Sequence, residues 1–114
     1  MKIHVSKPWG HYSDIYRPDD KKVVFKEIVV SAGEQLSHQY HKGRTEFWYI
    51  ASGEGVMTID DWETSVAEGD HMVIKPGEKH MVRNSGTGPL RIYEMQAGVC
   101  DEDDIVRLSD KYGR

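Results

Sequence analysis

The 114-residue sequence has a single cysteine, no long hydrophobic run and no excess of basic residues. Because Cys100 stands alone, an internal disulfide is excluded, and the fold must rest on burial, strand pairing and any bound metal. No apolar segment approaches the roughly 18 residues that cross a membrane, and the N-terminal residues lack the apolar stretch of about 7 to 15 residues found in signal peptides. We therefore expect no membrane partner and a cytoplasmic location.

The net charge of the chain is −4, from 15 Lys and Arg against 19 Asp and Glu. Binding to the phosphates of nucleic acid needs a basic stripe, whereas the basic residues here are dispersed among acidic ones. We therefore expect no nucleic-acid partner. A chain of this length can bury one core but not two, so residues 1–114 are predicted to form a single domain.

Apolar residues recur mainly at two-residue spacing, in short segments bounded by Gly, Pro, Asp and Ser. Many short strands at fairly even spacing are typical of a β-sandwich or β-barrel. The pattern predicts an all-β fold with strands at residues 23–30, 35–40, 46–52, 55–59, 62–66, 71–74, 80–84 and 90–96. Residues 101–108 are expected to form one short C-terminal helical turn after the last strand.

Four polar residues have the spacing of a metal site. Gln39 and His41 are two residues apart, so on a strand both side chains point to one face. Glu46 opens the next predicted strand, and His80 opens a later one after a Pro-Gly turn. Two imidazole nitrogens, a carboxylate oxygen and an amide oxygen suit Zn, Fe, Mn, Co or Ni and leave positions open for water or substrate. The alternative is four unrelated polar residues, because a histidine in a β protein is more often at the surface or hydrogen-bonded than a ligand.

The wider spacing argues against that alternative. The first motif is Gly33, five residues, Gln39-x-His41, four residues, Glu46, six residues and Gly53, and the second is Gly69, five residues, Lys75-Pro76-Gly77-Glu78-Lys79-His80, three residues and Asn84. The two motifs resemble those of the cupin superfamily. The resemblance implies a cupin barrel, a double-stranded β-helix or jelly roll, with one divalent metal held by Gln39, His41, Glu46 and His80. Gln39 stands in place of the usual first histidine, and Lys75 in place of a proline.

A closer resemblance comes from five segments. They look like the isomerase domain of type II mannose-6-phosphate isomerases, and they comprise residues 7–12, 36–48, 93–98, 102–107 and 110–114. In that family Gln is the usual first ligand. The resemblance implies interconversion of mannose 6-phosphate and fructose 6-phosphate, or a related pair, with one divalent ion, Zn first and Mn, Co, Ni or Fe as alternatives. Family members commonly carry this domain behind a mannose-1-phosphate guanylyltransferase domain, which this sequence lacks, so nucleotidyl transfer is not expected.

Isomerisation of this kind moves a proton between C1 and C2 of the sugar through an enediol. On their predicted strands, Lys26 shares a face with Ile28 and Val30, and Glu94 shares a face with Gln96. If these faces are interior, Lys26 and Glu94 are candidates for the base, the acid or a substrate contact, and Gln96 is a candidate substrate contact. The alternative for Lys26 and Glu94 is a salt bridge or an outward, solvated face.

A phosphate group is bound by Arg or Lys. Arg44, Arg107 and Arg114 lie in the family-like segments and are candidate substrate contacts, with a surface ion pair as the alternative for each. Trp48 has the strand parity of Glu46, so it is expected to point inward, where an aromatic wall suits the apolar face of a sugar. Simple core packing is the alternative for Trp48.

Two other functions stay open. One is a non-catalytic module that binds a sugar or sugar nucleotide, and the other is a different metal-dependent cupin enzyme, such as an iron oxygenase. We also expect a homodimer, because an open cupin sheet has edge strands that association would cover. Trp9 and Tyr12 in the N-terminal arm could pack on a partner subunit or across the barrel of their own chain.

Overall fold

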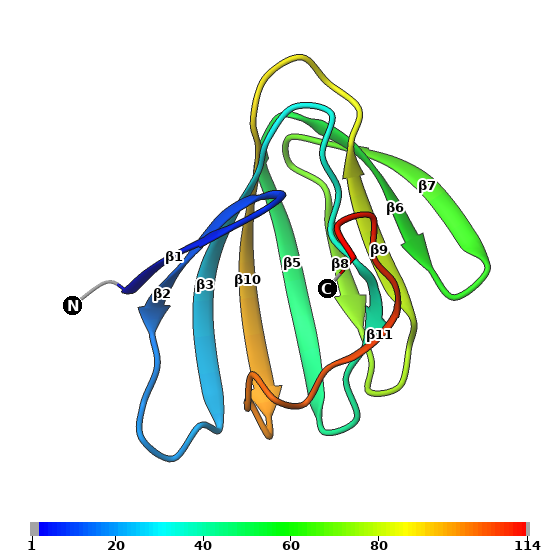
Figure 1. Ribbon diagram of the computed structural model, residues 1–114. Helices are drawn as coiled ribbons and strands as arrows, with labels where there is room; N and C mark the ends of the chain where they lie inside the picture. The colour runs from blue at the N-terminus through cyan, green and yellow to red at the C-terminus, as the bar shows by residue number, and fades with distance from the viewer. Residues whose placement is uncertain (1–2, 114) are drawn as a thin grey trace.

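The computed structural model describes residues 3–113, and that part of the chain contains strands but no helix (Figure 1). Two antiparallel sheets face each other. Sheet A contains, in spatial order, β1 (Ile3–Lys7), β2 (Gly10–Tyr16), β3 (Val23–Val30), β10 (Leu90–Gly98), β5 (Arg44–Ser52) and β8 (His71–Ile74). Sheet B contains β11 (Val106–Ser109), β4 (His38–Tyr40), β9 (His80–Asn84), β6 (Glu54–Ile59) and β7 (Trp62–Ala67). The all-β prediction is confirmed.

The inward and outward faces of sheet A are clearest on β5, where buried and more exposed side chains alternate. On β5, Glu46, Trp48 and Ile50 are buried, whereas Phe47 and Tyr49 between them are exposed. Side chains of successive strand residues point to opposite faces, so this period of two places every second residue of β5 in the barrel. Within residues 3–113, no helix is long and apolar enough to cross a membrane.

One end of the barrel interior is apolar. Its buried side chains come from both sheets and form one cluster made of Trp9, Ile28, Val30, Leu36, Trp48, Ile50, Met57, Val66, Ile74, Val82, Leu90 and Ile92. Full burial of one Val, Leu, Ile or Met side chain stabilises a fold by about 1.5–3 kcal/mol. This cluster therefore supplies the stability that the polar end of the same interior needs.

The N-terminal arm, β1 and β2, packs on its own chain. Trp9 is buried in the core cluster, and Tyr12 packs against that cluster. At Gly10, φ is +147° and an added Cβ would lie 2.0 Å from the carbonyl oxygen of Val29, so only glycine permits this close approach of the hairpin to β3. Of the two arrangements expected for Trp9 and Tyr12, the structure shows the one across the barrel of their own chain.

The predicted helical turn over residues 101–108 was wrong. A turn at Glu102 and Asp103 is followed by β11, which pairs with β4, so pairing with a sheet edge overrides the local preference of this segment. Strands β1 and β2 were not predicted either. The turn belongs to residues 99–105, which we call the mouth segment, because they run from the end of β10 across the opening of the barrel toward β11 (Figure 1).

Candidate metal centre and pocket

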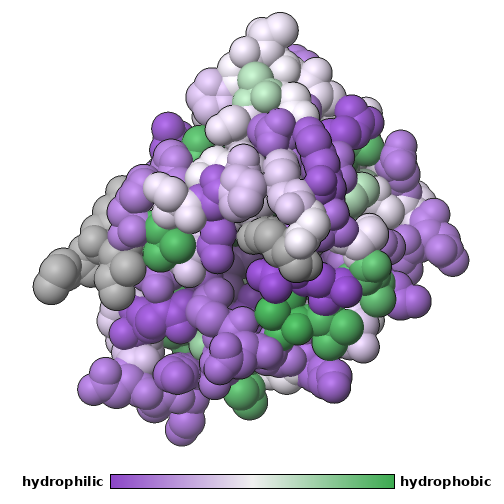
Figure 2. Space-filling view, viewed as in Figure 1, coloured by the Kyte–Doolittle hydropathy of each residue, from purple (hydrophilic) through white to green (hydrophobic). Residues whose placement is uncertain are grey.

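A pocket of about 180 Å³ opens between the two sheets at the polar end of the barrel. Hydrophilic side chains form much of the visible rim of the hollow on the face shown in Figure 2. The pocket is lined by every candidate site residue within residues 3–113, namely Lys26, Gln39, His41, Arg44, Glu46, Trp48, His80, Glu94, Gln96 and Arg107. Arg114, the remaining candidate, lies outside the described residues.

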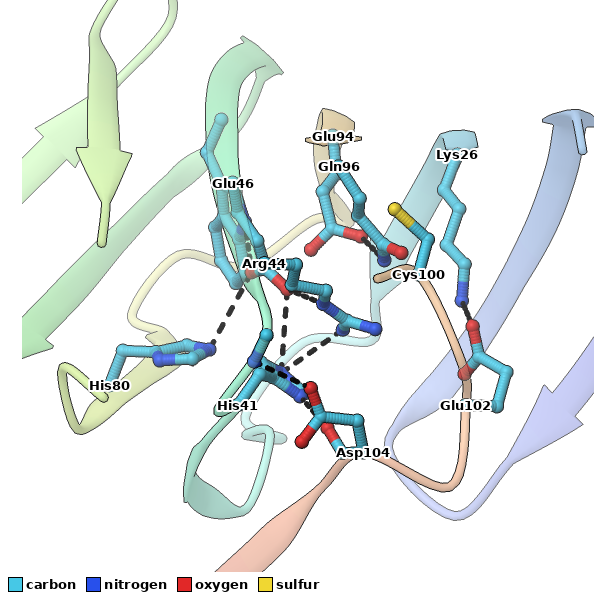
Figure 3. Close-up of polar contacts among 12 residues, drawn as sticks. Lys26, His41, Arg44, Glu46, His80, Glu94, Gln96, Cys100, Glu102 and Asp104 are labelled. Atoms are coloured by element: carbon cyan, nitrogen blue, oxygen red, sulfur yellow. Dashed lines mark hydrogen bonds and ion pairs between the residues drawn. The ribbon is translucent and has the colours of Figure 1, made fainter. Parts of the chain in front are cut away.

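His41, Glu46 and His80 form a buried group that could hold a metal ion, since their ligand atoms all lie within 4.8 Å of one another. The two carboxylate oxygens of Glu46 face different histidines: Oε2 lies 3.4 Å from His41 Nε2, and Oε1 lies 3.6 Å from His80 Nε2. His41 directly follows β4, Glu46 lies on β5, and His80 begins β9 (Figure 3). Three strands thus bring them to one point.

Main-chain carbonyls determine which nitrogen of each histidine faces the site. His41 Nδ1 lies 2.5 Å from the carbonyl oxygen of Asp104, and His80 Nδ1 lies 3.0 Å from that of Glu78. A carbonyl oxygen can only accept, so each Nδ1 carries the proton and each Nε2 presents a lone pair toward Glu46. His80 Nε2 is buried with no hydrogen-bond partner among residues 3–113. This donor set fits a divalent metal such as Zn.

Both histidines are held in the neutral form that binds metals. Burial, and then the positive charge of Arg44, lowers the pKa of His41 to about 4. Burial also lowers the pKa of His80, against the opposing effect of its hydrogen bond to Glu78. Neutral imidazole is the ligating form, so neither residue must lose a proton near pH 7 to bind an ion.

Gln39 lies beside this group, opposite His80 across the β4–β9 pairing. Its Nε2 donates to the carbonyl oxygen of Ser37 at 3.4 Å. An amide whose nitrogen is engaged in this way has its oxygen available as an acceptor or ligand. The place of Gln39 in the ligand set stays a prediction.

Arg44 and Trp48 contact the candidate ligands themselves. Arg44 Nε donates to Glu46 Oε2 at 2.7 Å, and Arg44 Nη2 lies 3.1 Å from His41 Nε2. Trp48 Nε1 donates to Glu46 Oε1 at 2.9 Å. The two side chains therefore orient the Glu46 carboxylate from both sides. Trp48 also belongs to the core cluster, so the packing alternative for this residue holds in the structure, and its contact with a sugar stays a prediction.

Glu94 contributes a buried carboxyl group to the lining of the pocket. Gln96 Nε2 donates to Glu94 Oε1 at 2.5 Å. Burial, and then the negative charge of Glu46, raises the pKa of Glu94 to about 7, against the opposing charge of Lys26. A carboxyl group with a pKa near the working pH can both accept and return a proton, which is what a proton-transfer residue must do.

Lys26 lies next to Glu94 across the β3–β10 pairing and is involved in a network that the sequence did not reveal. Its Nζ lies 2.5 Å from Glu102 Oε1 and 3.8 Å from Asp14 Oδ1. Arg17 bonds to the same two acids, at 2.7 Å to Asp14 and 2.6 Å to Glu102. Lys26 therefore lines the pocket and also forms the ion pair that was its alternative. Glu102 lies in a family-like segment, but nothing local in the sequence connects it with a lysine 76 residues away.

The barrel of two antiparallel sheets is that of a cupin. The chain superposes with a TM-score of 0.79 on a Klebsiella pneumoniae protein with a double-stranded β-helix domain, at 19% identity over 95% of this chain and 91% of that one. The Cnp3 cupin domain of Schizosaccharomyces pombe matches with a TM-score of 0.71 and 13% identity, over 77% of this chain and 64% of that one. These likenesses establish the cupin fold.

Within the cupins, the chain belongs to the mannose-6-phosphate isomerase C-terminal family, whose model matches residues 1–110. A mannose-1-phosphate guanylyltransferase of Escherichia coli K12 is 39% identical over 116 aligned residues, which cover 99% of this chain and 24% of that protein. The chain thus spans about a quarter of the length of this curated relative.

Proposed function

We propose that this chain is a metal-dependent sugar-phosphate isomerase that interconverts mannose 6-phosphate and fructose 6-phosphate. The observation that carries the proposal is the buried carboxyl group of Glu94, with its pKa near 7, in the same pocket as the His41–Glu46–His80 group. Membership of the mannose-6-phosphate isomerase C-terminal family supports the choice of substrate. The relevant chemistry needs one proton carrier and stabilisation of charge on two sugar oxygens.

In the proposed reaction Glu94, as the carboxylate, takes the proton from C2 of the open-chain form of mannose 6-phosphate, which leaves the C1–C2 enediolate with its negative charge on O1. Glu94 then returns the proton to C1, while the hydroxyl proton of O2 moves to O1, which gives the ketose. Gln96 holds Glu94 Oε1, so the second carboxylate oxygen is the one that moves the proton. A divalent ion held by His41, Glu46 and His80, with Gln39 as fourth ligand and Zn as the first choice, would supply Lewis-acid stabilisation of the sugar oxygens.

The test is turnover of a panel of hexose phosphates by protein stripped with a chelator and then reloaded with Zn, Mn, Co, Ni or Fe. We expect conversion of mannose 6-phosphate to fructose 6-phosphate only in the reloaded samples. The absence of turnover with every sugar and every metal would contradict the proposal. Oxygen consumption by the iron-loaded protein would instead favour the oxygenase alternative.

The second candidate is a non-catalytic module that binds a sugar or sugar nucleotide. It is favoured by the match to the E. coli relative, which is named a mannose-1-phosphate guanylyltransferase. The region that aligns with this chain makes up only 24% of that protein. A binding module would keep the pocket but would not need a proton carrier such as Glu94. Tight binding of mannose 6-phosphate without turnover would select this candidate.

Association into a homodimer stays a proposal. The outer face of sheet A exposes large apolar side chains, which a second copy would cover: Val23, Phe25, Phe47, Tyr49, Val73 and Met95. Light scattering at micromolar concentration should give twice the mass of one chain. A monomer mass would contradict it.

A further inference from the structure

The mouth of the pocket contains an ion cluster that the metal site does not use. Lys26 and Arg17 both bond to one oxygen, Glu102 Oε1, at 2.5 and 2.6 Å. The Lys26 side chain is only 5% exposed, whereas that of Glu102 is 45% exposed. The ammonium group of Lys26, in the wall of the pocket, is thus neutralised by a carboxylate that is half-exposed to solvent. Figure 3 shows the contact between the two side chains.

The mouth segment that carries Glu102 is anchored without this side chain. The amides of Val99 and Cys100 donate to the carbonyl oxygens of Gly43 and Lys21, at 2.8 and 2.9 Å. Further along, the Asp104 carboxylate accepts from two main-chain amides at 3.0 and 2.8 Å. The Glu102 side chain can therefore rotate into water while the main chain on either side of it stays in place.

We propose that Lys26 and Arg17 form a subsite for the phosphate group of the ligand, and that Glu102 is its internal occupant, which the phosphate displaces. That this phosphate belongs to a hexose 6-phosphate rests on the proposed function. The subsite itself requires only an anion with phosphate chemistry.

The donors of the subsite suit a phosphate better than a carboxylate. An ammonium and a guanidinium group offer many N–H donors, and a phosphate brings three acceptor oxygens and up to two negative charges, against the single charge of Glu102. Burial alone would raise the pKa of Glu102, but the charge of Lys26 and hydrogen bonds from Lys26 and Arg17 lower it to about 2. Glu102 is therefore an anion at every working pH and competes with the phosphate as one.

A second acid supports the lysine when Glu102 leaves. Asp14 Oδ1 is buried, lies 3.8 Å from Lys26 Nζ, and has no hydrogen-bond partner within the described part of the chain. Lys26 has three N–H donors, so it can bond to Asp14 and to a phosphate together. Lys26 therefore stays in position, and its buried charge stays paired when Glu102 moves into water.

The subsite lies on the opposite side of Glu94 from the metal candidates. On sheet A, Glu94 has Lys26 as its partner on β3 and Trp48 as its partner on β5, beside Glu46. A sugar phosphate bound with its phosphate at Lys26 and Arg17 would reach across Glu94 toward the His41–Glu46–His80 group. The spatial order of phosphate subsite, Glu94 and metal candidates matches a hexose 6-phosphate, in which the reacting carbons C1 and C2 are distant from the phosphate.

The test is titration of inorganic phosphate into chelator-treated protein by calorimetry, so that no metal contributes to anion binding. We expect Glu102→Gln to bind phosphate at least about tenfold more tightly than the parent, because an intramolecular competitor is removed. Asp103→Asn, which removes the same charge from an exposed neighbour in the same turn, should stay within about twofold of the parent. Adding Arg17→Met to Glu102→Gln should abolish the gain.

Equal phosphate affinity in Glu102→Gln and Asp103→Asn would overturn the proposal. Glu102→Asp, which keeps the charge on a side chain one methylene shorter, is a second variant that should also tighten phosphate binding, and no gain in it would count against the subsite. Circular dichroism establishes that each variant is folded. If Glu102→Gln gains phosphate affinity but the parent protein shows no isomerisation, the subsite is upheld and only the isomerase proposal is refuted. If the parent isomerises the sugar but Glu102→Gln has unchanged phosphate affinity, only the subsite is refuted.

Discussion

The two ends of the barrel interior use the same three strands of sheet A for opposite purposes. Toward one end, β3, β5 and β10 bury Val30, Ile50 and Leu90, and toward the other they bury Lys26, Glu46 and Glu94. On β5 and β10 the same alternation of side chains continues through both halves, and only the chemistry of the inward residues changes. Burial of charged groups at the polar end costs free energy, because these groups lose their contact with water. The comparison indicates that burial of apolar side chains at the other end offsets this cost.

The largest effect should follow from removing a candidate ligand at the polar end. We expect His80→Ala to lose the bound divalent ion, because the remaining imidazole and carboxylate provide too few ligands. Metal analysis after gel filtration should give one ion per parent chain and less than about a tenth of that in the variant. His71→Ala, at an exposed histidine on β8, is the control and should keep its metal. Full occupancy in His80→Ala would remove this site from the account.

The next effect concerns the apolar end. Ile92 is fully buried in the core cluster, so Ile92→Ala should lower the free energy of unfolding by about 2–5 kcal/mol through lost burial and a cavity. Val73→Ala, on the exposed face of β8, should cost less than about 1 kcal/mol. Urea unfolding of both variants measures the difference. A small cost for Ile92→Ala would mean that this end does not carry the stability of the fold.

At the polar end, a substitution should stabilise the protein. The pKa of Glu94 is raised to about 7, above its ordinary value near 4.5, so the folded chain favours the protonated form and loses stability as the pH rises from about 4.5 to about 7. In chelator-treated protein, Glu94→Gln should therefore raise the free energy of unfolding at pH 8.5 by up to about 3 kcal/mol, with little gain at pH 5. Glu68→Gln, at an exposed turn, should have no such pH-dependent gain. A gain for Glu94→Gln that is equal at both pH values would contradict the assignment.

A smaller effect is expected from Asp104. Its carboxylate accepts from the amides of Lys42 and Gly43, and its carbonyl oxygen accepts from His41 Nδ1. Asp104→Ala should loosen that carbonyl and weaken metal binding about tenfold, as measured by competition with a chelating dye. Asp103→Ala is the matched control. Equal metal affinity in the two variants would show that the mouth segment does not orient His41.

Local patterns in the sequence were sufficient for the central strands and the inward residues. The bounds predicted for β3, β8 and β9 match the structure, because their apolar alternation and turn residues are strong. Strand parity placed Lys26 and Glu94 on faces that line the pocket. Alternation needs no knowledge of distant neighbours, so it can be read from one strand at a time.

The parts that the sequence did not reveal depend on contacts between distant segments. Strand β11 forms because β4 offers an edge, although residues 101–108 alone favoured a helical turn. The ion pair between Lys26 and Glu102 joins residues far apart in the chain, and the polar strand β2, which carries Asp14 beside Lys26, has little alternation. Ion pairs between distant residues produce no periodic pattern in a single sequence, so they cannot be predicted from it.

The most direct test of the central claim compares the parent with Glu94→Gln, both loaded with metal to equal occupancy. The measurement is the turnover of mannose 6-phosphate beside a binding titration with the same sugar. If Glu94 carries the proton, turnover should fall by roughly a hundred- to ten-thousand-fold while the dissociation constant stays within about twofold, because the amide keeps the shape of the side chain. Equal turnover in the two proteins would contradict the account.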